Sequence, residues 1–360
     1  MSLSRRSLLA AAGATAPLLL TRPAHAAPPD LTTPEGWLSW IAAHRDQLSV
    51  VLDDGRGGRL HHRADLARPL ASAVKVLHLA AYADAVAAGR LDPREQVRVG
   101  DWERYYVPTD GGAHPASLRH LGVPLDENGL HAADPQHRVA LDDLAAVMIL
   151  FSDSAVPDLL RDRLGADAVA RAATVRGWPD ADVRSFSAEH LFLALPETAP
   201  PAGLPVDARR AWGFALEQRY RDDPALRAEA VRRLEAGVPG YPAQVVWASA
   251  TSAGSAEQLA AVHRALSTGG GLAREHLERP LAGSLPPGVL GIGLKGGSLP
   301  GVLTSGISVR REDRTLGWGA LLAHGDINAE QLSTGDPGLP LLLAIEDARW
   351  RDRLAAALGR

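Results

Sequence analysis

The sequence predicts an α+β fold, an α/β sandwich in which both chain ends build one antiparallel sheet that helices cover. Strand-like patterns occur near the two ends, over residues 48–63 and 291–323. Between them, apolar residues recur mainly at helical spacing, which predicts a mostly helical lobe inserted over about residues 100–285. We find no internal repeat, and 360 residues are enough for a sizeable core. We therefore assign residues 46–360 to one domain, preceded by a leader and helix over residues 27–45.

The first elements are predicted to be a helix, a hairpin and a second helix, over residues 35–45, 48–52 with 59–63, and 74–89. Residues 48–52 form a run with apolar β-branched residues, the intervening Asp-Gly and Gly-Gly pairs favour a turn, and residues 59–63 return as the second strand. The second helix ends naturally at Gly89. Ser72 is therefore expected at a helix N-terminus, where unpaired backbone N–H groups favour developing negative charge.

The middle of the chain predicts helices separated by irregular segments. Helical spacing extends over residues 141–151, 155–164, 208–236 and 255–266, the last of these opened by a Ser-Ala-Glu-Gln capping box. Residues 100–138 are predicted to be a loop and residues 184–195 to be irregular.

The C-terminal end returns to strands. We expect strands over residues 291–294, 302–310 and 316–323, followed by an amphipathic helix over residues 340–358. The last two strands are joined by the charged turn at residues 311–314. An antiparallel sheet that includes the first hairpin is the simplest way to bury these strands.

Composition excludes several classes of function. The formal net charge is −4 and basic residues are scattered, so we expect a small-molecule substrate and no nucleic-acid partner. The chain has no cysteine, which excludes disulfides, a thiol nucleophile and Cys-based metal sites. His114, His120, His131 and His137 fall in one segment without tight ligand spacing, and we interpret them as solvated loop histidines. We expect no metal, no cofactor and a monomer.

The N-terminus has the pattern of an export signal over residues 1–26. Arg5 and Arg6 resemble a twin-arginine motif, an apolar run follows over residues 8–20, and an Ala-His-Ala cleavage pattern ends at Ala26. The apolar run is shorter than the roughly 20 residues that span a membrane. We expect an exported protein that begins near Ala27 and contacts the membrane only during export. An uncleaved anchor or a disordered tail is the alternative.

The two lysines of the chain point to chemistry. Among 38 basic residues only Lys75 and Lys295 are lysine, and a lysine amine can lose its proton whereas a guanidinium effectively cannot. Lys75 follows Ser72 by three residues, so on a helix the amine and the hydroxyl share one face. In this S-x-x-K arrangement the amine can activate the serine as a nucleophile. The alternative is that Ser72 only caps a helix.

Three motifs in order resemble those of the serine β-lactamase and penicillin-binding-protein superfamily, closest to the class A pattern. They are Ser72 with Lys75, Ser152-Asp153-Ser154, and Lys295-Gly296-Gly297. The resemblance extends from about residue 48 to the C-terminus. It implies the β-lactamase/transpeptidase-like version of the fold predicted above. If it failed, Ser152 and Asp153 would only cap a helix end, and Asp153 is expected to be structural in either case.

The resemblance implies a role for each motif residue. Ser72 is the nucleophile that becomes acylated, and Lys75 accepts or relays its proton. Ser152 passes a proton to the leaving nitrogen, while Lys295 supplies positive charge to Ser152 and to a substrate carboxylate. The oxyanion hole would consist of the backbone N–H groups of Ser72 and Ser298, and such donors contribute about 3–4 kcal/mol to transition-state stabilisation.

Glu189 is the candidate for the base that activates the deacylating water. It follows Ser152 by 37 residues, near the position of the class A glutamate. The family pattern E-x-x-L-N ends here in Leu193, so the asparagine that helps to hold the water is absent. The alternative for Glu189 is a solvated loop carboxylate, and Glu197 is the fallback base.

Other departures affect substrate binding. Ser154 replaces the asparagine of S-D-N, and Gly296 lacks the hydroxyl that usually binds the substrate carboxylate in K-T-G. Ser298, just beyond Gly297, is the candidate substitute for that hydroxyl. Tyr105 is a candidate aromatic wall of the site, with a packed loop tyrosine as its alternative.

These inferences predict an exported serine hydrolase that acts through an acyl-Ser72 intermediate. The resemblance most directly implies class A-like β-lactam hydrolysis. The alternatives are a penicillin-binding-protein-type D,D-peptidase or esterase on the same fold, and a non-catalytic binding domain.

Overall fold

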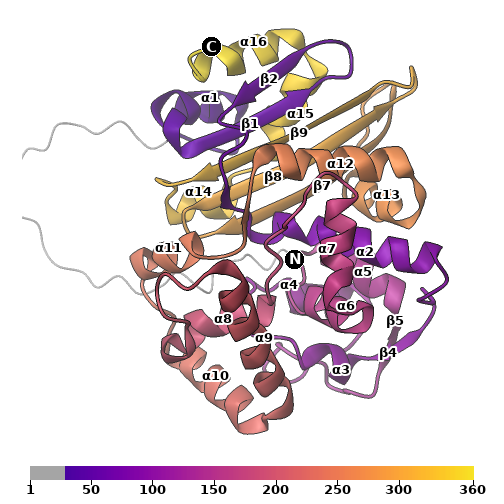
Figure 1. The fold of residues 1–360 in the computed structure, drawn as a ribbon, viewed down its shortest axis with the longest axis vertical. Coiled ribbons are helices and arrows are strands. Elements are labelled where there is room, and N and C mark those ends of the chain that lie inside the picture. Colours follow the sequence, from indigo (N-terminus) through magenta and orange to yellow (C-terminus); the bar gives the residue numbers. More distant parts are fainter. Residues whose placement is uncertain (1–28) are drawn as a thin grey trace, which may run out of the picture.

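The computed structural model describes residues 29–360 and has an antiparallel sheet of five strands at its centre (Figure 1). The strand order is β2-β1-β9-β8-β7. The bounds are β1 (Leu48–Asp53), β2 (Arg59–His62), β7 (Val289–Leu299), β8 (Val302–Arg311) and β9 (Leu316–His324). β1 pairs with both β2 and β9, so the two chain ends do form one sheet, as predicted. β7, which carries Lys295, lies at an edge of this sheet.

Alternating side chains of the sheet serve two cores. Val50 and Leu52 of β1 pack with α1 (Pro34–Ala43), α15 (Gly338–Glu346) and α16 (Ala348–Ala357) on one face. Val51 packs in the core on the other face, with residues of α2 (Lys75–Ala87) and α12 (Ala256–Gly269). Figure 1 shows where these two helices lie against the sheet. This alternation is what the two-residue period of a strand requires. α12 falls within the range that we assigned to the inserted lobe, yet it packs directly on the sheet.

Most of the remaining chain forms helices below the sheet, together with two small sheets, β3 (Arg68–Pro69) paired with β6 (Ala253–Gly254) and β4 (Gln96–Arg98) paired with β5 (Arg138–Ala140). The core on the Val51 face continues through α5 (Leu141–Leu150), α6 (Val156–Leu164) and α7 (Ala166–Thr174). A smaller core joins α8 (Phe186–Ala194), α9 (Val206–Asp222) and α10 (Pro224–Ala236) (Figure 1). The remaining helices are α3 (Val99–Glu103), α4 (Ala113–His120), α11 (Tyr241–Ser249), α13 (Gly271–Glu278) and α14 (Ala329–Thr334).

The structure corrects four expected elements. Residues 184–195 are not irregular, because Ser185 caps α8 by accepting a hydrogen bond from the Ala188 N–H. Residues 100–138 are not one loop, since they contain most of α3 and all of α4. The helix expected over 208–236 is two helices, since Asp223 caps a new one at Pro224. Asp347 likewise divides the final helix into α15 and α16.

The expected export signal lies outside the described residues. Within residues 29–360, no helix combines the length and the apolar character needed to cross a bilayer.

Candidate active site

Ser72 lies in a turn of 3₁₀ helix (Ala71–Val74) that leads into α2. This turn packs directly against β7. A Cβ atom on Gly297 would lie 2.5 Å from the Ser72 nitrogen and 2.7 Å from the Leu70 carbonyl oxygen. The Thr304 hydroxyl ties the two segments together by donating to the carbonyls of Leu70 and Gly297, at 2.8 and 3.2 Å. Gly297 is therefore required so that the edge strand can approach the nucleophile.

Lys75, the first residue of α2, has a fully buried side chain. Its Nζ lies 3.0 Å from Ser72 Oγ, 3.1 Å from Ser154 Oγ and 3.4 Å from Ser152 Oγ, and it also donates to the Ser152 carbonyl oxygen. Burial lowers the pKa of Lys75 to about 8, although the nearby Asp153 carboxylate opposes this shift. A sizeable fraction of the amine is therefore neutral near pH 7–8 and can accept a proton.

Lys295, on β7, also contacts the Ser152 hydroxyl. Its Nζ donates to Ser152 Oγ at 2.9 Å and to the Gly296 carbonyl oxygen at 2.8 Å. Burial, together with the charge of Lys75, lowers the pKa of Lys295 well below its ordinary value. Ser152 has a φ of +67°, a strained conformation for a residue with a side chain. The structure thus connects Ser72, Lys75, Ser152 and Lys295 in one line of polar contacts.

The Asp153 side chain stabilises the turn at residues 152–154 by hydrogen bonds. One carboxylate oxygen accepts from the Ala155 and Val156 N–H groups, at 2.9 and 3.0 Å. The other lies 2.8 Å from His114 Nδ1. Burial disfavours the charged imidazole, but Asp153 prevails and raises the pKa of His114 to about 9. His114 is fully buried, so its interpretation as a solvated loop histidine was wrong.

Glu189 lies beside Ser72 but is held by two arginines. It is buried on α8, where one carboxylate oxygen is 3.2 Å from Arg184 and the other is 3.1 Å from Arg209. It is therefore not a solvated loop carboxylate. The fallback candidate Glu197 is exposed and lies 3.3 Å from Arg233 on the surface.

A cavity of about 40 Å³ opens beside the nucleophile. It is lined by Ser72, Arg184, Ser185, Phe186, Glu189, His190, Trp247, Thr251, Ser252 and Leu299. Phe186 also covers the amine of Lys75, with 4.8 Å between Nζ and the ring centroid. No local motif identifies Phe186, His190 or Trp247 in the sequence, because they meet at the cavity only after α8 and α11 pack.

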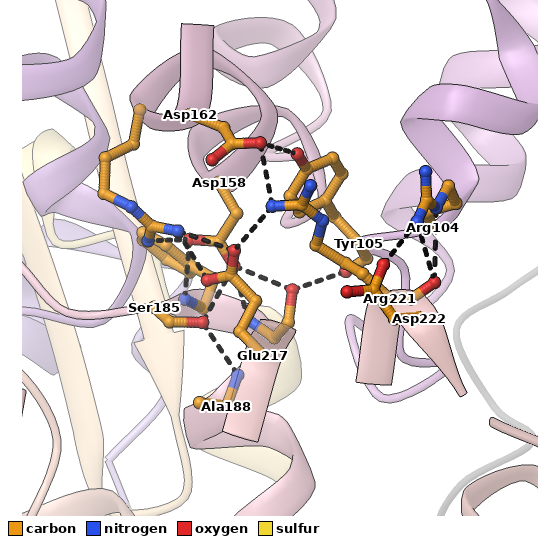
Figure 2. Close-up of polar contacts among 12 residues, drawn as sticks. Arg104, Tyr105, Asp158, Asp162, Ser185, Ala188, Glu217, Arg221 and Asp222 are labelled. Carbon is orange, nitrogen blue, oxygen red and sulfur yellow. Dashed lines mark hydrogen bonds and ion pairs between the residues drawn. The ribbon is translucent and has the colours of Figure 1, made fainter. Parts of the chain in front are cut away.

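Tyr105 is not an aromatic wall of this cavity. Its side chain is buried elsewhere, its hydroxyl donates to Asp162 at 2.7 Å, and its ring packs under the Arg221 guanidinium. Figure 2 shows Tyr105 and Asp162 within a larger polar network. The alternative of a packed tyrosine is therefore the correct one.

The same network anchors α8, the helix that carries the cavity wall (Figure 2). Asp158 is fully buried and accepts from the N–H groups of Phe186 and Ser187, at 3.1 and 2.7 Å. Arg161 bridges Asp158 and Glu217, so that α6, α8 and α9 meet at one buried ion-pair cluster. A carboxylate at a helix N-terminus also interacts favourably with the helix dipole.

The remaining predicted residues lie around the nucleophile. Ser154 contacts Lys75 rather than open solvent. Ser298 is exposed on edge strand β7, next to Gly297, and the oxyanion hole proposed for its N–H remains a prediction. A Cβ added to Gly296 would make one tight contact, 3.3 Å from the Thr304 carbonyl oxygen, so a side chain there requires a small shift of the neighbouring strand. Among residues 29–360, no group of three or more His, Asp or Glu side chains is placed to hold a metal ion.

Comparison with known proteins agrees with this geometry. Residues 38–281, more than half of the chain, match the model of the β-lactamase enzyme family. The chain belongs to this family. No curated protein matches the chain.

Solved structures share the fold at low sequence identity. A β-lactamase from Sphaerobacter thermophilus is 17% identical, covers 86% of this chain and 97% of its own, and has a TM-score of 0.53. A β-lactamase from Chitinophaga pinensis is 13% identical, covers 87% and 99%, and has the same TM-score. The predicted α+β fold is thereby confirmed, and the family supports a serine β-lactamase-like hydrolase.

Proposed function

We propose that this protein forms an acyl-enzyme at Ser72 with amide or ester substrates, β-lactams among them. Ser72 Oγ attacks the carbonyl carbon while its proton passes to Lys75 Nζ. The bond from this carbon to the leaving nitrogen or oxygen then breaks, and the leaving atom receives a proton through the Ser152 hydroxyl. Water hydrolyses the resulting ester, which releases the acid and restores Ser72.

The contact between Lys75 and Ser72 is the observation that carries this proposal. A buried amine with a lowered pKa, 3.0 Å from a serine hydroxyl, is the arrangement a general base requires. Lys295 supports it because its Nζ donates a hydrogen bond to Ser152 Oγ, the hydroxyl that passes the proton. A binding domain without catalysis would have no need for two buried lysines in contact with three serines, since burying a lysine amine is costly.

Within this chemistry, class A-like β-lactam hydrolysis is the first candidate. The family match and the order of the three motifs favour it. Hydrolysis of β-lactams requires rapid deacylation, and Glu189 is the carboxylate that lines the cavity beside Ser72.

A penicillin-binding-protein-type acyl-transfer enzyme is the second candidate, and one observation favours it. Both oxygens of Glu189 are bound by arginines, and Phe186 covers the amine of Lys75. Within residues 29–360, no carboxylate is hydrogen-bonded to Ser72 or Lys75. This environment supports acylation and leaves water poorly activated, so the acyl-enzyme would persist.

Intact-protein mass spectrometry with a chromogenic cephalosporin tests both candidates, with Ser72→Ala as the control. Colour with little adduct would establish rapid hydrolysis. A persistent adduct on wild type alone would favour the second candidate. If neither colour nor an adduct appears, acylation of Ser72 by this cephalosporin is contradicted.

We also propose that the protein is exported by a twin-arginine-type signal. The support is the sequence of residues 1–26 alone. Replacing Arg5 and Arg6 by lysine should retain the protein inside the cell, whereas the unaltered chain should be recovered outside the cytoplasm with Ala27 as its first residue. Equal distribution of the two chains would contradict this assignment.

A further inference from the structure

The charged groups around the cavity are already engaged by protein partners. Arg184 donates from three nitrogens to Asp182, Glu189 and the Ala250 carbonyl oxygen, at distances between 2.6 and 3.2 Å. Glu189 is in turn bound by Arg184 and Arg209. A charged group of a substrate would therefore have to displace an existing ion pair in a buried setting, which is unfavourable.

The uncharged groups of the wall offer little polarity. Phe186, Trp247 and Leu299 present apolar surfaces to the cavity. Burial, assisted by the charge of Lys75, lowers the pKa of His190 to about 4, so its ring is neutral at physiological pH. The Trp247 indole is fixed, because Nε1 donates to the Glu189 carbonyl oxygen at 2.7 Å.

Two lining hydroxyls, those of Thr251 and Ser185, are also engaged, which leaves the Ser252 hydroxyl and Ser72 itself as the hydroxyls that face the cavity. Thr251 donates to the Ala248 carbonyl oxygen at 2.8 Å, and the Ser185 hydroxyl lies 3.1 Å from Asp158. The cavity therefore favours a group that forms no hydrogen bonds of its own.

The position of the cavity assigns it to the acyl part of the substrate. Ser152 and Lys295 do not line it, although Ser72 does. The leaving group must lie near Ser152 to receive its proton, so the acyl chain is the part left to enter the cavity. A water molecule needs about 10–15 Å³ by the same measure, so 40 Å³ holds about three atoms of that size.

We propose that this site selects carbonyl substrates with a short, uncharged acyl group, about three carbons beyond the carbonyl. The proposal rests on acyl-Ser72 formation and adds the substrate class. For β-lactams it means that compounds with a small substituent on the carbon next to the carbonyl acylate Ser72 faster than those with a bulky one.

A series of p-nitrophenyl esters from acetate to octanoate tests the proposal. The rate of acyl-Ser72 formation is followed by intact mass and by nitrophenolate release. It is divided by the spontaneous hydrolysis rate of each ester and corrected with Ser72→Ala. Wild type should be fastest with propionate or butyrate and about tenfold or more slower with octanoate. A normalised rate that is flat or rises with chain length would overturn the proposal.

Trp247→Ala enlarges the cavity and should move the optimum to longer chains, bringing octanoate to within about threefold of butyrate. Trp212→Ala is the matched control, because Trp212 is 45% exposed on α9 and does not line the cavity. It should keep the wild-type profile. If Trp247→Ala does not fold, Leu299→Ala serves the same purpose, and the wild-type series decides the question by itself.

The experiment distinguishes failure of acyl-Ser72 formation from failure of the acyl-pocket assignment. If none of the esters acylates the protein, acyl-Ser72 formation with these substrates is contradicted. Acylation without the expected chain-length preference, or an unchanged optimum in the enlarged cavity, would contradict only the assignment of the acyl pocket.

Discussion

Lys75 shows how one residue can connect the whole site. Its amine contacts Ser72 in its own helical turn and also Ser152 and Ser154, which are about 80 positions away in the chain. The first contact follows from local helix geometry. The other two require α5 and the following turn to pack beside α2.

Lys75→Arg is expected to reduce the acylation rate by at least about a thousandfold, because arginine keeps the charge but cannot accept a proton. The wild-type rate should itself rise with pH through about 8, because Lys75 must be neutral to accept the proton and is charged below its pKa. Stopped-flow acylation across pH 5–10 measures both effects. A wild-type rate in the variant, or a flat pH profile, would contradict the role of Lys75.

Glu189→Gln tests the deacylation step. Under the second candidate, in which arginines occupy both carboxylate oxygens, the deacylation rate should change by less than about twofold while stability falls by about 2 kcal/mol. Adduct lifetime is measured by mass spectrometry, and stability by urea unfolding. Strong accumulation of the adduct in the variant would instead identify Glu189 as the base that activates water.

Among the secondary-structure elements, α8 depends most on its buried anchor. The Asp158 carboxylate accepts hydrogen bonds from the first backbone N–H groups of α8. Arg161 and Glu217 complete this buried cluster, whose acidic members Asp158 and Glu217 are labelled in Figure 2. α8 in turn supplies Phe186, Glu189 and His190 to the cavity. The cluster therefore positions the cavity wall without touching a substrate.

Asp158→Asn should reduce the free energy of unfolding by about 3 kcal/mol, because it leaves the Arg161 charge partly uncompensated in a buried position. KM for ester substrates should rise more than kcat falls, since the wall moves while the contacts of Ser72 and Lys75 remain. Asp352→Asn, an exposed position on α16, is the matched control. If the free energy of unfolding and KM change equally in the two variants, Asp158 has no special positioning role.

At the scale of the whole molecule, the His114–Asp153 pair links the site to global stability. The folded-state pKa of His114 is raised to about 9, above the ordinary 6.5. The stabilisation is therefore fully present below pH 6.5 and is lost as the pH rises through about 9.

His114→Phe should be less stable than wild type by about 3 kcal/mol at pH 6, and this difference should shrink toward pH 10. Urea unfolding at pH 6, 8 and 10 gives the difference directly. A difference that is independent of pH would show that the imidazole only fills space.

Much of the architecture could be predicted, because strand alternation, helical periodicity and capping residues are local signals. The hairpin at residues 48–63, the capping box at Ser255 and the three C-terminal strands are confirmed. The errors occur where one residue ends a helix within a continuous pattern, as at Asp223 and Asp347, or where a short helix lacks periodicity, as in α8. Such boundaries depend on caps that a pattern over many residues does not detect.

By itself, the sequence indicated the family and singled out Ser72 and Lys75 as the candidate nucleophile and base, because the Ser72–Lys75 spacing and the two rare lysines are properties of the chain. Only the tertiary structure decided which groups surround them. It placed Phe186 over Lys75, bound Glu189 between two arginines, buried His114 beneath Asp153 and moved Tyr105 away from the cavity. The physical reason is that a side chain's partners in a packed interior come from elements that lie far apart in sequence, and no local pattern records which of them meet.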